Sequence, residues 1–82
     1  MVYVDAPIWN YGRMKMCHML ADSEDELHAM AAAIGIKKKW FQNDRYPHYD
    51  ICKFKRTLAI QNGAVEIDRK QFVKLAKKNS YE

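Results

Sequence analysis

The segment KMCHMLADSEDELHAMAAAIG, residues 15–35, joins a strand pattern directly to a helix pattern. Residues 15–21 alternate between two faces, with His18 on one side and Cys17 on the other. This period of two is typical of a β-strand. A helix that starts directly after a strand indicates a layered α/β fold.

The helix half of this segment has start and stop signals. Ser23 followed three residues later by Glu26 predicts a capping box, in which each residue bonds the backbone N–H of the other. Gly35 is expected to end the helix in the left-handed conformation. Between them, an apolar stripe at helical spacing is formed by Leu27, Met30, Ala31 and Ile34.

The remaining elements are shorter. We expect strands at residues 2–5 and 64–67 and a short strand within 36–42. Helices are expected from about Cys52 to Asn62, with Phe54 and Leu58 inward, and from the Asp68 cap to about Lys78. Residues 6–14 and 43–50 are expected to be loops. The predicted fold is a small single-domain α/β sandwich, residues 1–82, of order β-β-α-(β)-α-β-α with a mixed or parallel sheet.

Length and composition exclude several protein classes. The chain has 82 residues, 49% hydrophobic and 29% charged, which fits one globular domain. No apolar run approaches the roughly 18 residues of a membrane span. Residues 1–36 hold two basic and five acidic residues, a net −3, whereas residues 37–82 hold twelve and five, a net +7. The basic half either attracts anions or is a solvated, lysine-coated surface.

Cysteine usage and the first residues indicate a compartment. Cys17 and Cys52 are the only cysteines, and the first residues lack the basic and apolar regions of a signal peptide. We therefore expect two reduced thiols and a cytoplasmic protein with no membrane association.

His18 and Asp22 are the first candidate site residues. If residues 15–22 stay extended, the two side chains share a face at the end of a strand, close to a helix N-terminus. Asp5 follows the first strand, so the three side chains would meet if the two strands were parallel neighbours. A histidine beside carboxylates can be a general base. The alternative is a buried histidine, with Asp22 acting as a helix cap.

The second candidate is the segment YPHYD, residues 46–50. The segment combines two aromatic rings, an imidazole and a carboxylate in one predicted loop, where binding residues are frequent; they belong to Tyr46, Tyr49, His48 and Asp50. Arg56 follows near the start of the next helix and could hold a phosphate. The alternative is a proline-anchored turn in which Asp50 caps that helix.

Metal, thiol and nucleic-acid chemistry have weaker support. The sequence contains neither a C-x-x-C nor an H-E-x-x-H spacing, so no metal site is predicted and the cofactor is unknown. A metal site formed by His18, His48 and the carboxylates is a weakly supported alternative. Both cysteines are expected to be packing residues. Trp40 and Phe41 beside three lysines, residues 37–39, could form a stacking platform for nucleic acid, but side chains in this position are more often core.

An ordered set of short motifs resembles a known family. The motifs are Val2-Tyr3-Val4-Asp5-Ala6-Pro7, Trp9, Gly12-Arg13, Cys17-His18, Ala21-Asp22, Glu26-Leu27-His28, Trp40-Phe41-Gln42, Pro47-His48-Tyr49-Asp50, Lys55-Arg56 and Gly63-Ala64 with Glu66. Together they resemble the family catalogued as domain of unknown function 4031, small proteins of bacteria and their phages. The resemblance covers residues 2 to about 67 and implies kinship without a mechanism.

The resemblance favours a functional role for polar residues near the ends of predicted elements. Its pattern falls on Asp5, Trp9, Arg13, His18, Asp22, His28, His48, Tyr49, Asp50 and Arg56. Packing alone would favour aliphatic positions. We therefore expect His18, His48 and Asp22 as catalytic candidates, and a ligand-binding set of Asp5, Trp9, Arg13, Tyr49, Asp50 and Arg56.

The leading functional hypothesis is a site for a small anionic ligand, such as a nucleotide or other phosphate compound, with hydrolytic or transfer chemistry. The alternative is a phage or bacterial interaction module that binds a host protein without catalysis. The third hypothesis is nucleic-acid binding through the basic half. A core this small would also favour a homodimer.

Overall fold

Five strands form one mixed sheet in the computed structural model, which describes residues 1–6 and 9–79, with only the backbone of residues 9–11. The strands are β1 (Val2–Val4), β2 (Trp9–Tyr11), β3 (Met14–Ala21), β4 (Tyr49–Cys52) and β5 (Val65–Glu66). All pairings are antiparallel except that of β1 with β5. The predicted α/β fold with a mixed sheet is confirmed.

The long strand β3 is the centre of the sheet. Met16 pairs with both Trp9 and Cys52, and Met19 pairs with both Val4 and Tyr49. A residue pairs with two strands only on opposite edges, so β1 and β2 share one edge of β3 and β4 occupies the other. On this edge of β3, residues 17–18 lie between the positions that pair with β1 and those that pair with β2.

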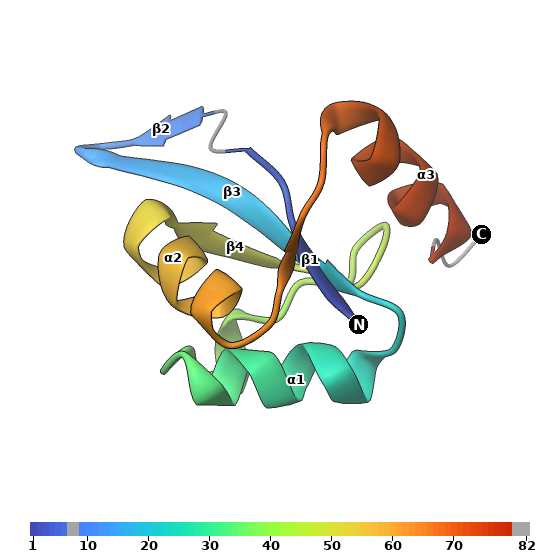
Figure 1. Cartoon of the computed structure of the whole chain (residues 1–82), viewed down its shortest axis with the longest axis horizontal. Coiled ribbons are helices and arrows are strands. Elements are labelled where there is room, and N and C mark those ends of the chain that lie inside the picture. Colours follow the sequence, from blue (N-terminus) through green and yellow to red (C-terminus); the bar gives the residue numbers. More distant parts are fainter. Residues whose placement is uncertain (7–8, 80–82) are drawn as a thin grey trace.

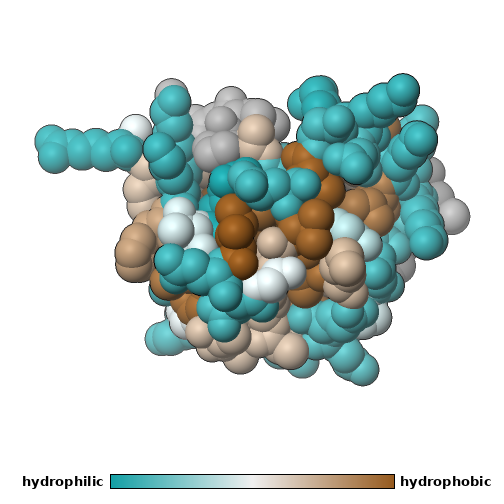
Figure 2. Space-filling model, in the orientation of Figure 1, coloured by the Kyte–Doolittle hydropathy of each residue, from teal (hydrophilic) through white to brown (hydrophobic). Residues whose placement is uncertain are grey.

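Helices cover both faces of this sheet (Figure 1). The helices α1 (Glu24–Ala33) and α2 (Lys53–Gln61) pack on the face that carries Cys17 and Met19, where the fully buried core lies. The helix α3 (Arg69–Lys78) lies on the opposite face, which carries His18. Its lysines point to solvent, and Figure 2 shows a hydrophilic outer surface there. None of the described helices is long and apolar enough to cross a membrane.

The helix caps follow the sequence signals, with one change. Asp68 and Gln71 form the full capping box of α3, with bonds of 2.8 and 3.0 Å. At α1, Ser23 Oγ accepts from the Glu26 N–H at 3.2 Å, as predicted. The Glu26 carboxylate, however, accepts from the Ser23 hydroxyl and the N-terminal ammonium of Met1 rather than reaching back to the cap backbone. Gly35 follows α1 with φ 81°.

Three local predictions are wrong. The predicted loop at 6–14 contains β2, although Pro7 lies outside the described residues. The short strand expected within 36–42 is a 3₁₀ turn, η1 (Lys38–Trp40), and only Gln42 joins the sheet, by a bridge to His48. The predicted loop at 43–50 ends inside β4. The reason is the alternation of buried Tyr49 and Ile51 with polar neighbours, which is a strand pattern.

Two aromatic side chains also lie elsewhere than expected. Phe54, predicted to face inward from α2, is 68% exposed, and Ala59 is the residue of α2 that is buried. Trp40, which we expected to favour the core, is 61% exposed, whereas Phe41 packs against the core.

Candidate imidazole–carboxylate site

Asp5 and His18 form a paired group at the break between β1 and β2. Asp5 Oδ1 accepts the backbone N–H of His18 at 2.6 Å, and Asp5 Oδ2 lies 2.8 Å from His18 Nδ1. The backbone N–H of Asp5 donates to the His18 carbonyl at 3.2 Å, which continues the ladder of β1. An ionised carboxylate can only accept, so in the neutral ring the proton sits on Nδ1 and Nε2 is the basic nitrogen.

Arg56 supports this pair from α2. Its Nε donates to the Asp5 carbonyl at 2.8 Å, and its Nη2 donates to Glu66 Oε1 at 2.9 Å. The guanidinium therefore ties α2 to the end of β1 and to β5. This geometry gives the predicted ligand residue Arg56 a positioning role for Asp5.

His48 and Asp50 form a second pair on the same sheet face, because Asp50 is the register partner of His18. His48 Nδ1 donates to the Tyr46 carbonyl at 2.9 Å, which leaves Nε2 as the basic nitrogen in the neutral ring. That Nε2 lies 3.6 Å from Asp50 Oδ1. Asp50 Oδ2 accepts from Gln42 Nε2 at 2.8 Å, but Oδ1 is buried with no hydrogen-bond partner among the described residues.

Aromatic rings enclose the two imidazoles, which are 5.8 Å apart between centroids. Phe72 of α3 stacks on His18 at 4.6 Å, and Tyr46 lies 4.5 Å from His48. Burial raises the pKa of Tyr46, and the nearby Asp50 carboxylate acts in the same direction. We call Asp5, His18, His48 and Asp50 the imidazole–carboxylate cluster.

The cluster can accept and release protons. Each imidazole has a nearby carboxylate that can stabilise its protonated form. The unpartnered Asp50 oxygen marks a place for a further hydrogen-bond donor, because buried polar atoms are rarely left unsatisfied. Proton transfer to a bound molecule is therefore the chemistry that this arrangement supports.

Thiol and metal chemistry have no such arrangement. Burial, with a smaller contribution from the Asp5 carboxylate, raises the pKa of the Cys17 thiol to about 12. Its side chain lies in the core, so its contribution is packing. Both cysteines are free thiols. Within residues 1–6 and 9–79, no group of three or more histidine, cysteine or acidic side chains could hold a metal ion.

A groove of about 660 Å³ adjoins the cluster, because Asp50 is part of its lining. Asp50 and Gln42 form part of its wall, next to β4. Three lysines line it, namely Lys37, Lys39 and Lys55. We call this cavity the lysine-rimmed groove.

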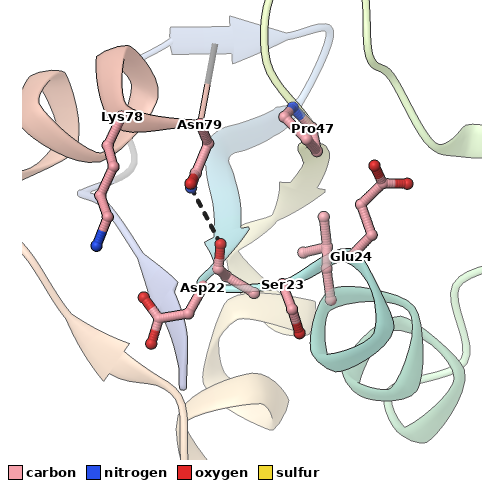
Figure 3. Close-up of a pocket in the computed structure, with 8 residues that line it drawn as sticks. Asp22, Ser23, Glu24, Pro47, Lys78 and Asn79 are labelled. Atoms are coloured by element: carbon pink, nitrogen blue, oxygen red, sulfur yellow. Dashed lines mark hydrogen bonds between the residues drawn. The ribbon is translucent and has the colours of Figure 1, made fainter. Parts of the chain in front are cut away.

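Asp22 does not join the cluster, which corrects the arrangement expected from parallel strands. Because β1 and β3 are antiparallel, the end of β3 lies beside the start of β1, and Asp22 accepts from the Met1 ammonium and the Tyr3 hydroxyl. It lines a separate pocket of about 300 Å³ at the start of α1 (Figure 3), where Asn79 donates to the Ala21 carbonyl.

The other predicted residues are scattered. Arg13 lies in the exposed turn before β3, beyond Met14, which stands roughly 13 Å from His18 at about 3.3 Å per residue. Tyr49 is fully buried, and its hydroxyl is hydrogen-bonded to His28 Nδ1 at 2.8 Å. Trp9 lies in β2, and its side chain is outside the described atoms.

Three contributors were not in the predicted catalytic or ligand-binding sets, although Tyr46 belongs to the candidate segment at residues 46–50. Gln42 holds Asp50, Tyr46 holds His48, and Phe72 covers His18. The alternation from His48 to Ile51 was the available signal for a strand that brings His48 and Asp50 together. No comparable local pattern relates Phe72 to His18, which are 54 positions apart.

Comparison with known protein families identifies the family of this chain. A family model described as protein of unknown function (DUF4031) matches residues 2–79. No curated protein and no solved structure matches the chain.

Proposed function

Because the chain belongs to this family of unknown function, whose description names no activity, we propose a function from the site itself. The protein binds a small anionic ligand, a nucleotide or another phosphate compound, against the imidazole–carboxylate cluster. The observation that carries the proposal is the pairing of two imidazoles with two carboxylates on one sheet face. The proposed setting is the reducing cytoplasm of a bacterium or a phage-infected cell, which suits two free thiols.

The positive charge for such a ligand comes from the lysine-rimmed groove. Arg56 is bonded to Glu66 and to the Asp5 carbonyl, and Arg13 lies at the far end of β3. The groove lysines line the same cavity as Asp50, which belongs to the cluster, so an anion held by them would adjoin the cluster. In this proposal the groove lysines take the ligand-binding role that the sequence predicted for Arg13 and Arg56.

The cluster would serve hydrolysis by exchanging two protons. His48 Nε2 takes a proton from water as the water oxygen bonds to phosphorus. The bond between phosphorus and the leaving oxygen breaks, and protonated His18 supplies that oxygen with its proton. Exchange with solvent then restores both rings. Acid–base groups of this kind contribute typically 10²- to 10⁴-fold to a rate.

The test uses three named probes: inorganic phosphate, AMP and ATP. Ring ¹H–¹⁵N spectra of the labelled protein should show that at least one probe shifts the His18 and His48 resonances while those of His28 stay in place. His28 is the matched control because its Nδ1 bonds Tyr49 on the other side of the sheet. If no probe shifts either ring, the proposed site is wrong.

Turnover is tested with the same compounds. Release of inorganic phosphate from AMP or ATP should fall at least tenfold in His18→Gln and in His48→Gln and stay unchanged in His28→Gln. Binding and phosphate release that both survive the two cluster substitutions would exclude this assignment. Capture of one stoichiometric host protein by wild type and both variants would then favour the interaction module.

A further inference from the structure

We propose that the lysine-rimmed groove binds an amphipathic anion, a molecule with one apolar body and one phosphate, sulfonate or carboxylate group. This inference deepens the proposed function and rests on it, because Asp50 belongs to both the groove and the cluster. It adds the class of ligand and the place of its apolar part.

The groove has the volume and the apolar lining that are common in small-molecule binding sites. Its volume of about 660 Å³ lies within the range of roughly 300–1,000 Å³ common for ligand pockets. Apolar side chains line most of it, among them Met14, Met16, Ile36 and Trp40. Met16 and Asp50 lie on the sheet face that carries His18, so the floor continues the face of the cluster.

Two of these apolar side chains are unusually open to solvent. Trp40 is 61% exposed and Met14 is 47% exposed, in a chain whose core is small. The helix α3 covers this sheet face at His18, whereas Met14 stays open at the other end of β3. Gathered exposed apolar groups beside a cavity are a usual sign of a binding surface.

The charges around this floor favour an anion. Lys37 and Lys39 come from the segment after α1, and Lys55 comes from α2. Lys55 Nζ donates to the Ile34 carbonyl at 2.7 Å, which anchors its ammonium at the end of α1. Asp50 is the acidic side chain in the described lining, and its Oδ2 is held by Gln42.

The combination selects an amphipathic molecule over simpler ones. Inorganic phosphate would meet the lysines but leave the apolar floor in water. A neutral apolar molecule would cover the floor and gain nothing from three ammonium groups. Lys39 also stands 5.4 Å from the centre of the Trp40 ring, so cation and aromatic surface are presented together.

The experiment uses two fluorescent probes with the same rings. 8-Anilinonaphthalene-1-sulfonate carries an anionic group, and N-phenyl-1-naphthylamine lacks it. We expect saturable binding of the sulfonate that weakens with added salt, because surface charges are screened. The neutral amine should bind more weakly and without salt dependence. Equal, salt-independent binding of both probes would overturn the charged part of the proposal.

Substitutions locate the binding. The double change Lys37→Ala and Lys39→Ala should weaken sulfonate binding by about fivefold to tenfold. Trp40→Ala should weaken the binding of both probes. The control Lys70→Ala with Lys74→Ala removes the same charge from exposed positions of α3. Equal loss in both double variants would refute the groove. Unchanged thermal unfolding midpoints establish that each variant is folded.

The outcome also separates this inference from the proposed function. His28→Gln should leave sulfonate binding unchanged, because His28 belongs to neither the groove nor the cluster. Sulfonate binding that depends on the lysines, with imidazoles that respond to no phosphate probe, would keep the groove and reject the function. Imidazoles that respond, with no effect of the lysine or tryptophan substitutions, would reject the groove alone.

Discussion

The Asp5 carboxylate holds His18 at two points, the backbone N–H at 2.6 Å and the ring Nδ1 at 2.8 Å. The first bond takes the place of a strand-to-strand bond where β1 stops pairing, and the second orients the imidazole. The buried Asp5 side chain therefore completes the backbone hydrogen bonding at the end of β1 and positions the His18 ring. Because Asp5 is only 4% exposed, its charge depends on these partners.

Asp5→Asn should separate these two roles. The amide oxygen can still accept the His18 backbone N–H, but an amide nitrogen facing Nδ1 is a donor against a donor. We expect a loss of about 1–3 kcal/mol in the free energy of unfolding, measured by urea denaturation. Long-range ¹H–¹⁵N spectra of the neutral ring should show that the Nδ1–H form of His18 is lost.

The control for this change is Asp44→Asn, which removes the same charge from an exposed loop position. It should alter the free energy of unfolding by under about 0.5 kcal/mol. An unchanged His18 tautomer in Asp5→Asn would contradict the orienting role of the carboxylate.

Phe72→Ala should loosen α3 and uncover His18. Phe72 is half-buried, so we expect a loss of about 1–2 kcal/mol, below the 3–5 kcal/mol common for a buried phenylalanine. Hydrogen exchange should accelerate across α3, and His18 should react faster with diethyl pyrocarbonate. Val73→Ala, an exposed neighbour on the same helix, is the control and should change neither rate.

Much of the fold was predictable because its signals are local. The alternation of residues 15–21, the N-cap at Ser23 and the capping box at Asp68 lie within single elements, and the structure bears them out. The second bond of the predicted box at Ser23 does not form, because Glu26 bonds Met1 and the Ser23 hydroxyl. The β4 strand was missed although His48 and Asp50 alternate with Tyr49 and Ile51. The proline and polar residues that precede this strand are typical of a loop, so the sequence favours a loop prediction for that segment.

The candidate site was predictable only in part, because strand pairing is a long-range property. Asp5, His18, His48 and Asp50 were candidates from their residue types, and the structure brings these four together. Asp22 was assigned to the same place on the assumption of parallel strands, and antiparallel pairing puts it at the other end of β3. The groove lysines come from two segments that no sequence spacing relates.

Cys17 should be unreactive in the folded protein. Its pKa of about 12 leaves almost no thiolate at pH 8, and the core excludes reagents. Titration with a disulfide reagent should count one rapidly reacting thiol, Cys52, in the native state and two in guanidinium. In Cys52→Ser the rapid reaction should disappear, and its persistence would contradict this assignment.

The same shift affects stability at high pH. The pKa of the Cys17 thiol is raised from an ordinary value of 9.0 to about 12 in the folded state, so the folded form favours the protonated thiol. This contribution is fully present below about pH 9 and is lost progressively as pH rises toward 12. Cys17→Ala should reduce the dependence of the free energy of unfolding on pH within that window, as followed by urea denaturation.

Tyr49→Phe should affect stability and not ligand binding. The substitution removes the hydroxyl bonded to His28 inside the core and keeps the ring between His28 and Phe41. We expect a loss of about 1 kcal/mol in the free energy of unfolding. Binding of the anilinonaphthalene sulfonate should be unchanged, and weaker binding at equal stability would restore Tyr49 as a ligand residue.

Asp50→Asn should have the opposite effect on stability to Asp5→Asn. Asp50 Oδ1 is buried without a partner and lies 3.6 Å from His48 Nε2, so its charge is poorly compensated. An amide can donate toward that nitrogen and still accept from Gln42 through its oxygen. We expect a free energy of unfolding equal to wild type or higher by about 0.5–1 kcal/mol. Functional groups are often retained at a cost in stability. If Asp50 is such a group, the response of His48 to phosphate probes should be lost in the same variant. A destabilisation as large as that of Asp5→Asn would mean that Asp50 is a structural residue whose charge the fold requires.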